Sequence, residues 1–208
     1  MEKSKIKREL ILIKAKEVFI RNGFSRTTMK DIIDECEISR GGIYLYFSAT
    51  EEIFVEVVKK HNRAKLQTLK DRIEKSDDFN RLIDDFFRDQ KERLFQMDKS
   101  LFVAMIEFSF SHKNTTNRDF YTEQFSNTKN MLLELLKFGM KENVIKANNI
   151  DKLADTILFL VEGLRSLAVS GGISEKTADE QINVCKYLVL SDSLNEENGI
   201  KKKERSKK

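Results

Sequence analysis

The chain has 208 residues, of which 40% are hydrophobic, and it contains no proline and only 8 glycines. This length allows one or two domains, and the composition favours long uninterrupted helices, so an all-α fold is predicted. No apolar run approaches the roughly 18 residues that a membrane span requires, and the charged N-terminus is not followed by a signal-peptide segment. These features exclude a membrane protein, and a cytoplasmic location is expected.

The formal net charge of +4 is concentrated at the two ends of the chain. Residues 1–47 carry 10 basic and 7 acidic side chains, and residues 195–208 carry 6 basic and 3 acidic ones. Basic side chains at the N-terminal end can contact the phosphates of nucleic acid, although a solvated helix face is the simpler interpretation of any single one. These side chains are Lys3, Lys5, Lys7, Arg8, Arg26 and Lys30.

Two helices are predicted near the N-terminus. The first runs from about Lys5 to Asn22 and ends at Gly23, which is suited to a helix C-cap. Thr27 is the expected N-cap of the second helix. The apolar residues of this second helix recur at i, i+3, i+4 and i+7 and therefore share one face: Met29, Ile32, Ile33 and Cys36.

A third helix follows after about three residues, with Ser39 as its expected N-cap. Ile43 and Phe47 are four residues apart and should point inward together. This turns Arg40, Gly41, Tyr44 and Leu45 outward. Two short helices joined so closely indicate a helix-turn-helix whose second helix enters a DNA major groove. The alternative is a flexible Gly41-Gly42 loop with Tyr44, Leu45 and Tyr46 in the core.

A set of residues with fixed spacing runs through this N-terminal segment: Ile11, Leu12, Ala15, Val18, Phe19, Gly23, Phe24, Thr27, Thr28, Met29, Ile38, Ser39, Arg40, Gly41, Tyr44, Leu45, Tyr46, Phe47, Glu51, Glu52, Ile53 and Phe54. With this spacing, the chain resembles the DNA-binding domain of the TetR family of bacterial transcriptional regulators. The resemblance implies a homodimer that binds a near-palindromic operator in double-stranded DNA. The implied DNA-binding residues are Arg26, Thr27, Thr28, Ser39, Arg40, Gly41, Gly42, Tyr44, Leu45, Tyr46 and Thr50.

The chain departs from the family pattern at three positions. Glu37 stands where the family usually has a turn glycine, and Ile33 stands where it usually has alanine. Thr50 replaces a lysine that usually contacts phosphate. Only the Thr50 departure bears on DNA contact.

Three parts of the chain are predicted: a helix-turn-helix domain at 1–47, a helical ligand-binding and dimerisation domain at 48–194, and a disordered basic tail at 195–208. A long fourth helix, running to roughly Lys75, should link the first two parts. Five more helices bring the total to about nine, and their predicted limits are Phe79–Met97, Lys99–His112, Asn117–Glu142, Asp151–Val169 and Ser174–Leu194. Their expected N-caps are Asp77 or Asp78, Asn149 or Asp151, and Ser174.

The middle helices are rich in phenylalanine and methionine, most of which should form the core. Such a core can also enclose an apolar cavity, and the resemblance implies a small apolar or amphipathic effector there. The candidate pocket residues are His61, Phe86, Phe87, Phe102, Met105, Phe108, Tyr121 and Phe125. For His61 an ordinary core histidine is the simpler interpretation.

The last two helices are apolar over more than half of their circumference and need cover on two sides. A second copy of the chain would supply the second cover, and the resemblance implies a four-helix dimer interface. Burial within one subunit is the alternative. The candidate interface residues are Ile157, Val161, Leu164, Leu167, Cys185 and Leu188.

An enzyme is not expected. His61 and His112 have no nucleophile or carboxylate at motif spacing, and the chain has no phosphate-binding glycine loop or zinc motif. Cys36 and Cys185 should be buried thiols rather than a disulfide, and no cofactor is expected. The sequence therefore predicts a dimeric, ligand-responsive DNA-binding repressor. The alternative is a helical small-molecule sensor or adaptor that acts through another protein.

Overall fold

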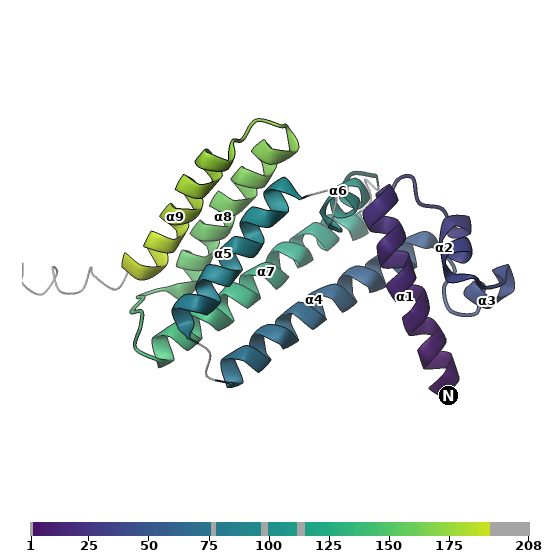
Figure 1. Cartoon of the computed structure of the whole chain (residues 1–208), viewed down its shortest axis with the longest axis horizontal. Coiled ribbons are helices and arrows are strands. Elements are labelled where there is room, and N and C mark those ends of the chain that lie inside the picture. Colours follow the sequence, from purple (N-terminus) through teal and green to yellow (C-terminus); the bar gives the residue numbers. More distant parts are fainter. Residues whose placement is uncertain (1, 76–77, 97–99, 112–114, 192–208) are drawn as a thin grey trace, which may run out of the picture. The chain divides into compact units, whose positions relative to one another are not determined.

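The computed structural model describes residues 2–75, 78–96, 100–111 and 115–191, and these ranges contain nine α-helices and no strand (Figure 1). The predicted all-α fold is therefore confirmed. The basic tail at 195–208 and His112 lie outside the described residues. The chain divides into two compact units: Met1–Thr68 with Gln96–Gln124, and Leu69–Phe95 with Phe125–Lys208. None of the helices in the described ranges is both long and apolar enough to cross a lipid bilayer.

The first unit contains the helix-turn-helix and the helices that pack on it. α1 packs against α2 and α6, and α2 packs against α3. α4 and α7 each begin in this unit and continue into the second one. The helices are α1 (Glu2–Asn22), α2 (Met29–Cys36), α3 (Arg40–Tyr44), α4 (Thr50–Glu74), α6 (Phe102–Ser111) and α7 (Thr115–Lys141).

Aromatic rings form the centre of the first unit. Phe54 of α4 is fully buried, and its ring centroid lies 4.9 Å from that of Phe19, 5.0 Å from Phe24, 5.0 Å from Phe108 and 6.0 Å from Phe120. Aromatic pairs at such distances add to the stabilisation that burial alone supplies. Helix α6 is thus part of the core that supports the helix-turn-helix.

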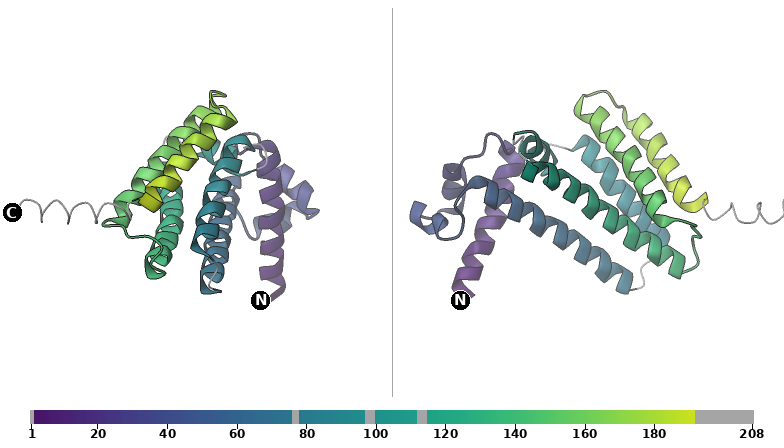
Figure 2. Two further views of the ribbon diagram at one scale, coloured as in Figure 1. Left: turned by 60° about the vertical axis from the view of Figure 1, so that its left-hand side comes forward. Right: turned by 180° about the vertical axis from the view of Figure 1, so that it is seen from behind.

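The second unit is a bundle in which α5, α8 and α9 pack pairwise (Figure 2). Its helices are α5 (Phe79–Phe95), the remainder of α7, α8 (Ile150–Val169) and α9 (Glu175–Ser191). Two ion pairs join α5 to α9: Lys91–Asp179 at 2.6 Å and Lys186–Asp84 at 2.7 Å. Exposed pairs of this kind add little stability, so apolar burial holds the bundle together.

Local capping explains where the later helices begin. Asp78 accepts a hydrogen bond from the Arg81 amide at 3.2 Å, and Asn149 accepts one from the Lys152 amide at 2.9 Å. Ser174 accepts one from the Thr177 amide at 3.1 Å. The sequence predicted Asp77 or Asp78 as the first of these caps and Asn149 or Asp151 as the second. The hydrogen bonds assign the two caps to Asp78 and Asn149.

Candidate DNA-binding interface

Helices α2 and α3 form the predicted helix-turn-helix, separated by residues 37–39. Ile32 and Cys36 are buried, and Met29 and Ile33 pack on the same cluster from partly buried positions. The apolar face predicted for α2 is therefore confirmed.

The start of α2 is fixed by Thr28 rather than by Thr27, so the predicted N-cap was wrong by one residue. Thr28 Oγ1 accepts from the Asp31 amide at 3.3 Å, and the Asp31 carboxylate accepts from the Thr28 amide at 2.8 Å. Hydrogen bonds from Thr28 hold the pKa of Asp31 below its usual value. Thr27 is instead buried, and its hydroxyl donates to the Gly23 carbonyl at 2.6 Å, which closes the loop between α1 and α2.

The turn between the two helices depends on a left-handed residue. Glu37 caps α2 with φ +53°. Its amide donates to the Asp34 carbonyl at 3.2 Å. A non-glycine residue in this conformation costs about 1–2 kcal/mol. The conformation explains why a glycine is usual here in the family and shows that the turn forms despite Glu37.

Helix α3 presents the outward face that its spacing predicts. Ile43 and Phe47 are buried, and Arg40, Tyr44 and Leu45 are exposed, with Leu45 at 81%. The Arg40 guanidinium lies 5.8 Å from the centre of the Tyr44 ring, so the two side chains share one patch. The alternative of a flexible Gly41-Gly42 loop with Tyr44 and Leu45 in the core is therefore excluded, whereas Tyr46 does pack against the core.

The two glycines of α3 have different roles. A Cβ atom on Gly42 would lie 3.1 Å from Ser39 Oγ, the atom that caps the helix by accepting from the Gly42 amide at 3.2 Å. A Cβ atom on Gly41 would meet nothing within 4 Å. The fold of the unit therefore does not require a glycine at position 41. The backbone there is open to close approach by another molecule.

Arg26, Tyr46 and Thr50 are further predicted contact residues of the same unit. Arg26 is exposed, and its Nε donates to the Asn22 carbonyl at 3.1 Å. Thr50 is half-buried at the first position of α4. Tyr46 is half-buried and packs on the core of the unit.

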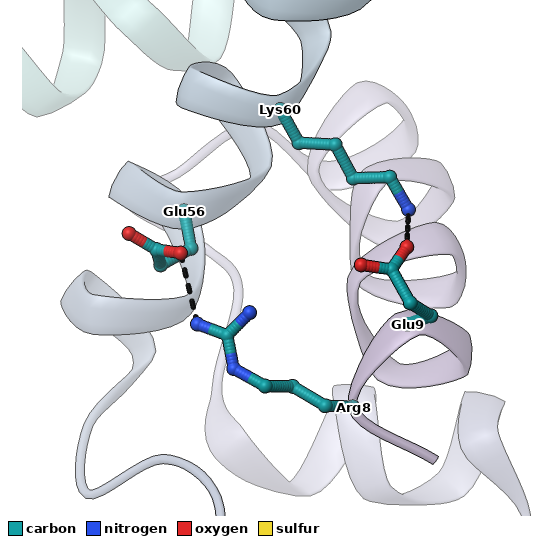
Figure 3. A network of polar contacts seen from close by, with 4 residues as sticks. All are labelled: Arg8, Glu9, Glu56 and Lys60. Atoms are coloured by element: carbon teal, nitrogen blue, oxygen red, sulfur yellow. Dashed lines mark hydrogen bonds and ion pairs between the residues drawn. The ribbon is translucent and has the colours of Figure 1, made fainter. Parts of the chain in front are cut away.

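Among the basic residues of α1, Arg8 has a structural partner (Figure 3). Its guanidinium donates to Glu56 of α4 at 2.8 Å and lies 5.0 Å from the centre of the Phe47 ring. The hydrogen bond from Arg8 lowers the pKa of Glu56. A second ion pair, Lys60–Glu9, joins the same two helices. Arg8 therefore joins α1 to α4 and to Phe47, which follows α3. Lys5 and Lys7 of α1 and Lys30 of α2 are exposed.

Glu107 of α6, which no sequence pattern singled out, contacts the loop between α1 and α2. The Glu107 carboxylate of α6 accepts a hydrogen bond from the Ser25 amide, in the loop between α1 and α2, at 2.9 Å. The only sequence signal is an acidic residue within the apolar run Phe102–Phe110.

The candidate pocket residues divide between the two units. His61, Phe102, Met105, Phe108 and Tyr121 belong to the first unit, and Phe86, Phe87 and Phe125 belong to the second. Phe108 is buried among aromatic rings of the first core, and Phe87 is fully buried in the second. These two side chains are assigned to packing, and the pocket as a whole stays a prediction.

Four of the candidate dimer residues are instead core residues of the second unit. Ile157, Val161 and Cys185 are 0% exposed and Leu164 is 6% exposed. Their apolar character is explained by burial within the subunit, so they are not available to a partner. Leu167 is exposed and Leu188 is half-buried. Other exposed apolar side chains of the same two helices were not among the predicted interface residues: Phe159, Leu160, Val184 and Tyr187.

Comparison with known proteins agrees with this geometry. Residues 11–57 match the family described as bacterial regulatory proteins, tetR family. YfiR, an HTH-type transcriptional regulator of Bacillus subtilis, is 57% identical over 49 residues. This match covers 24% of the present chain and 24% of YfiR, so it spans about a quarter of that relative.

Two solved structures share the fold over most of the chain. E. coli NemR in its reduced form has a TM-score of 0.67 at 17% identity, covering 88% of this chain and 97% of NemR. B. subtilis FadR in complex with stearoyl-CoA has a TM-score of 0.62 at 17% identity, covering 87% of this chain and 97% of FadR. The matched residues 11–57 contain the helix-turn-helix, so this segment is a DNA-binding domain of the tetR family of bacterial regulatory proteins, and the rest of the chain shares the fold of the solved regulators.

Proposed function

We propose that this protein is a transcriptional repressor that binds a near-palindromic DNA operator as a homodimer. The observation that carries the proposal is the outward face of α3, where Arg40, Tyr44 and Leu45 are exposed around the open backbone of Gly41. A helix of this kind, held by a buried face behind it, is suited to entering a major groove.

The residues around this face divide by the contact that they are suited to make. Arg40 and Tyr44 carry donors that reach base edges, and Leu45 offers an apolar contact to a thymine methyl group. Arg26, Thr28 and Thr50 are suited to phosphate contacts, which give affinity and register rather than sequence preference. Thr50 is shorter and uncharged compared with the usual lysine, so fewer counterions should be released on binding.

Replacing Arg40 or Tyr44 with alanine should weaken operator binding by about 1–3 kcal/mol each, as loss of a base contact does. Both side chains are exposed, so the melting temperature should stay unchanged. Arg63→Ala, which removes an exposed arginine from α4, is the matched control. Fluorescence anisotropy with operator and random duplexes measures the effect, and unaltered operator affinity in both variants would remove them from the reading face.

The experiment that tests the function as a whole is selection of genomic fragments by the purified protein. Enrichment of one near-palindromic sequence, with binding that weakens as salt rises, supports the repressor. If no sequence is enriched over random DNA, the result favours the alternative, which is a helical sensor or adaptor that acts through another protein.

We propose that the dimer forms through the exposed apolar face of α8 and α9, here called the α8–α9 face. Its residues are Phe159, Leu160, Gly163 and Leu167 on α8 and Val184, Tyr187 and Leu188 on α9. A Cβ atom on Gly163 would meet nothing within 4 Å, so this position allows a helix of a second copy to approach closely. Exposed apolar side chains on two helices that pack together are typical of a protein interface.

An effector that releases DNA is the remaining part of the proposal. The structural neighbour FadR was solved with stearoyl-CoA, and an apolar or amphipathic ligand suits the phenylalanine-rich helices of this chain. If the ligand weakens operator binding, then linkage requires the operator to weaken ligand binding by the same factor. Titrating apolar compounds against free protein and against the operator complex tests this, and equal affinities in both would exclude coupling.

Thiol chemistry is not expected to control this regulator. Cys36 and Cys185 are free and buried, and burial raises the pKa of both thiols, that of Cys185 to about 11. Because the thiolate is the reactive form and less than about one part in a thousand of Cys185 is thiolate at neutral pH, its reaction should be slow. Native protein should therefore modify slowly with a thiol reagent, and denatured protein rapidly, with reactivity rising towards pH 11. Fast labelling of the native protein at pH 7 would contradict this.

A further inference from the structure

We propose that Glu107 of α6 is a positioning residue for DNA binding, because its carboxylate holds the loop between α1 and α2 that presents Arg26 and Thr28. This inference rests on the proposed DNA-binding function and adds a residue that lies outside the helix-turn-helix. All of the groups involved belong to the first unit.

The contact is specific. The Glu107 carboxylate accepts from the Ser25 amide at 2.9 Å, although the two residues are 82 positions apart in sequence. A Cβ atom built on Gly23 would lie 2.5 Å from one carboxylate oxygen and 2.8 Å from the other. The carboxylate therefore lies directly against the Gly23 backbone, which only a glycine permits.

The neighbouring residue of α6 fixes the apolar side of the same loop. Phe108 is 3% exposed, and its ring meets that of Phe24 edge-on at 4.8 Å. Glu107 and Phe108 thus contact three consecutive loop residues, 23–25, one through a hydrogen bond and the other through ring packing.

Hydrogen bonds within the loop constrain it as well, among them the bond from the Thr27 hydroxyl to the Gly23 carbonyl. Gly23 adopts φ +75°, and its amide donates to the Phe19 carbonyl at 3.0 Å. The Thr27 amide donates to the Phe24 carbonyl at 3.1 Å. These bonds shape the turn from within, whereas Glu107 and Phe108 contact it from α6. The position of α6 is therefore coupled to the loop that leads to the Thr28 cap.

Glu107 is an acidic residue on the unit proposed to contact phosphates, so attraction to DNA does not explain its role there. Its role is to accept the hydrogen bond from the Ser25 amide, which a neutral side-chain oxygen can also do. A role as hydrogen-bond acceptor and an effect of charge therefore predict opposite changes in DNA affinity. Loss of the acceptor should weaken DNA binding, although loss of the charge alone should strengthen it.

The test compares Glu107→Ala, Glu107→Gln and the matched control Glu123→Ala, which removes an exposed carboxylate of the same unit. Glu107→Ala should bind the selected operator about tenfold more weakly, equivalent to about 1.4 kcal/mol. Glu107→Gln keeps an oxygen acceptor and should bind at least as tightly as wild type. Glu123→Ala should bind as wild type does.

Amide hydrogen exchange supplies the readout that general destabilisation would not produce. In Glu107→Ala the Ser25 amide should exchange faster, and the Gly42 amide should keep its rate. Equal operator affinities for wild type and Glu107→Ala would overturn the proposal, as would equal weakening by Glu107→Ala and Glu107→Gln. If the wild type itself selects no operator, then the proposed function fails, which is a distinct outcome.

Discussion

Replacing Phe54 with alanine should lower the free energy of unfolding by about 3–5 kcal/mol, the range found when a large buried aromatic side chain is truncated. Phe54 is 0% exposed and contacts four other rings, those of Phe19, Phe24, Phe108 and Phe120. The cavity left by the missing ring cannot collapse easily, because the four rings come from three other helices and from the loop between α1 and α2. Denaturant unfolding followed by circular dichroism measures the change.

The matched control is Phe110→Ala. Phe110 lies on α6 in the same unit but is 79% exposed, so its loss should change stability by less than about 0.5 kcal/mol. Similar destabilisation by the two substitutions would mean that the ring cluster is not the centre of the first unit. Since α2 and α3 pack on this core, Phe54→Ala should also reduce the fraction of protein that binds operator at elevated temperature.

Patterns that depend on nearby residues were predictable from the sequence. The spacing of Ile43 and Phe47 predicted the inward face of α3, Ser39 was identified as the N-cap of α3, and Asn149 was one of two candidates for the N-cap of α8. Thr27 and Thr28 are chemically equivalent, but only Thr28 has an acidic residue three positions later, Asp31, with which it forms a capping box. This local signal identifies Thr28 as the cap, and apolar periodicity does not contain it.

Contacts between distant segments were not predictable. Arg8 was interpreted as a phosphate contact because nothing in the sequence places Glu56 beside it. The Glu107 hydrogen bond was missed for the same reason. Apolar periodicity likewise showed that α8 and α9 must be covered, but not by which neighbour. Ile157 and Val161 are covered by their own unit, whereas Phe159 and Leu160 remain exposed.

The largest functional effect is expected from Gly163→Arg on the α8–α9 face. The subunit itself should tolerate the change, because a Cβ atom there meets nothing within 4 Å. Arginine also favours a helix interior over glycine by about 0.5–1 kcal/mol. A long charged side chain would, however, keep a second copy from approaching and would bury an unpaired charge if the dimer formed. Sedimentation should therefore show a folded monomer where the wild type is dimeric.

Operator binding should fall with dimerisation, since a monomer holds only one half-site. Linked binding to two half-sites typically exceeds the single-site affinity by about 10²–10⁴-fold, so a loss of at least about 100-fold is expected for Gly163→Arg. Gly163→Ala is the control, because a methyl group leaves the apolar approach largely open. A Gly163→Arg protein that stays dimeric and binds the operator normally would show that the dimer uses another surface. A stable monomer with full operator affinity would instead show that one α3 is sufficient, which would remove the two-fold symmetry from the proposed mode of DNA reading.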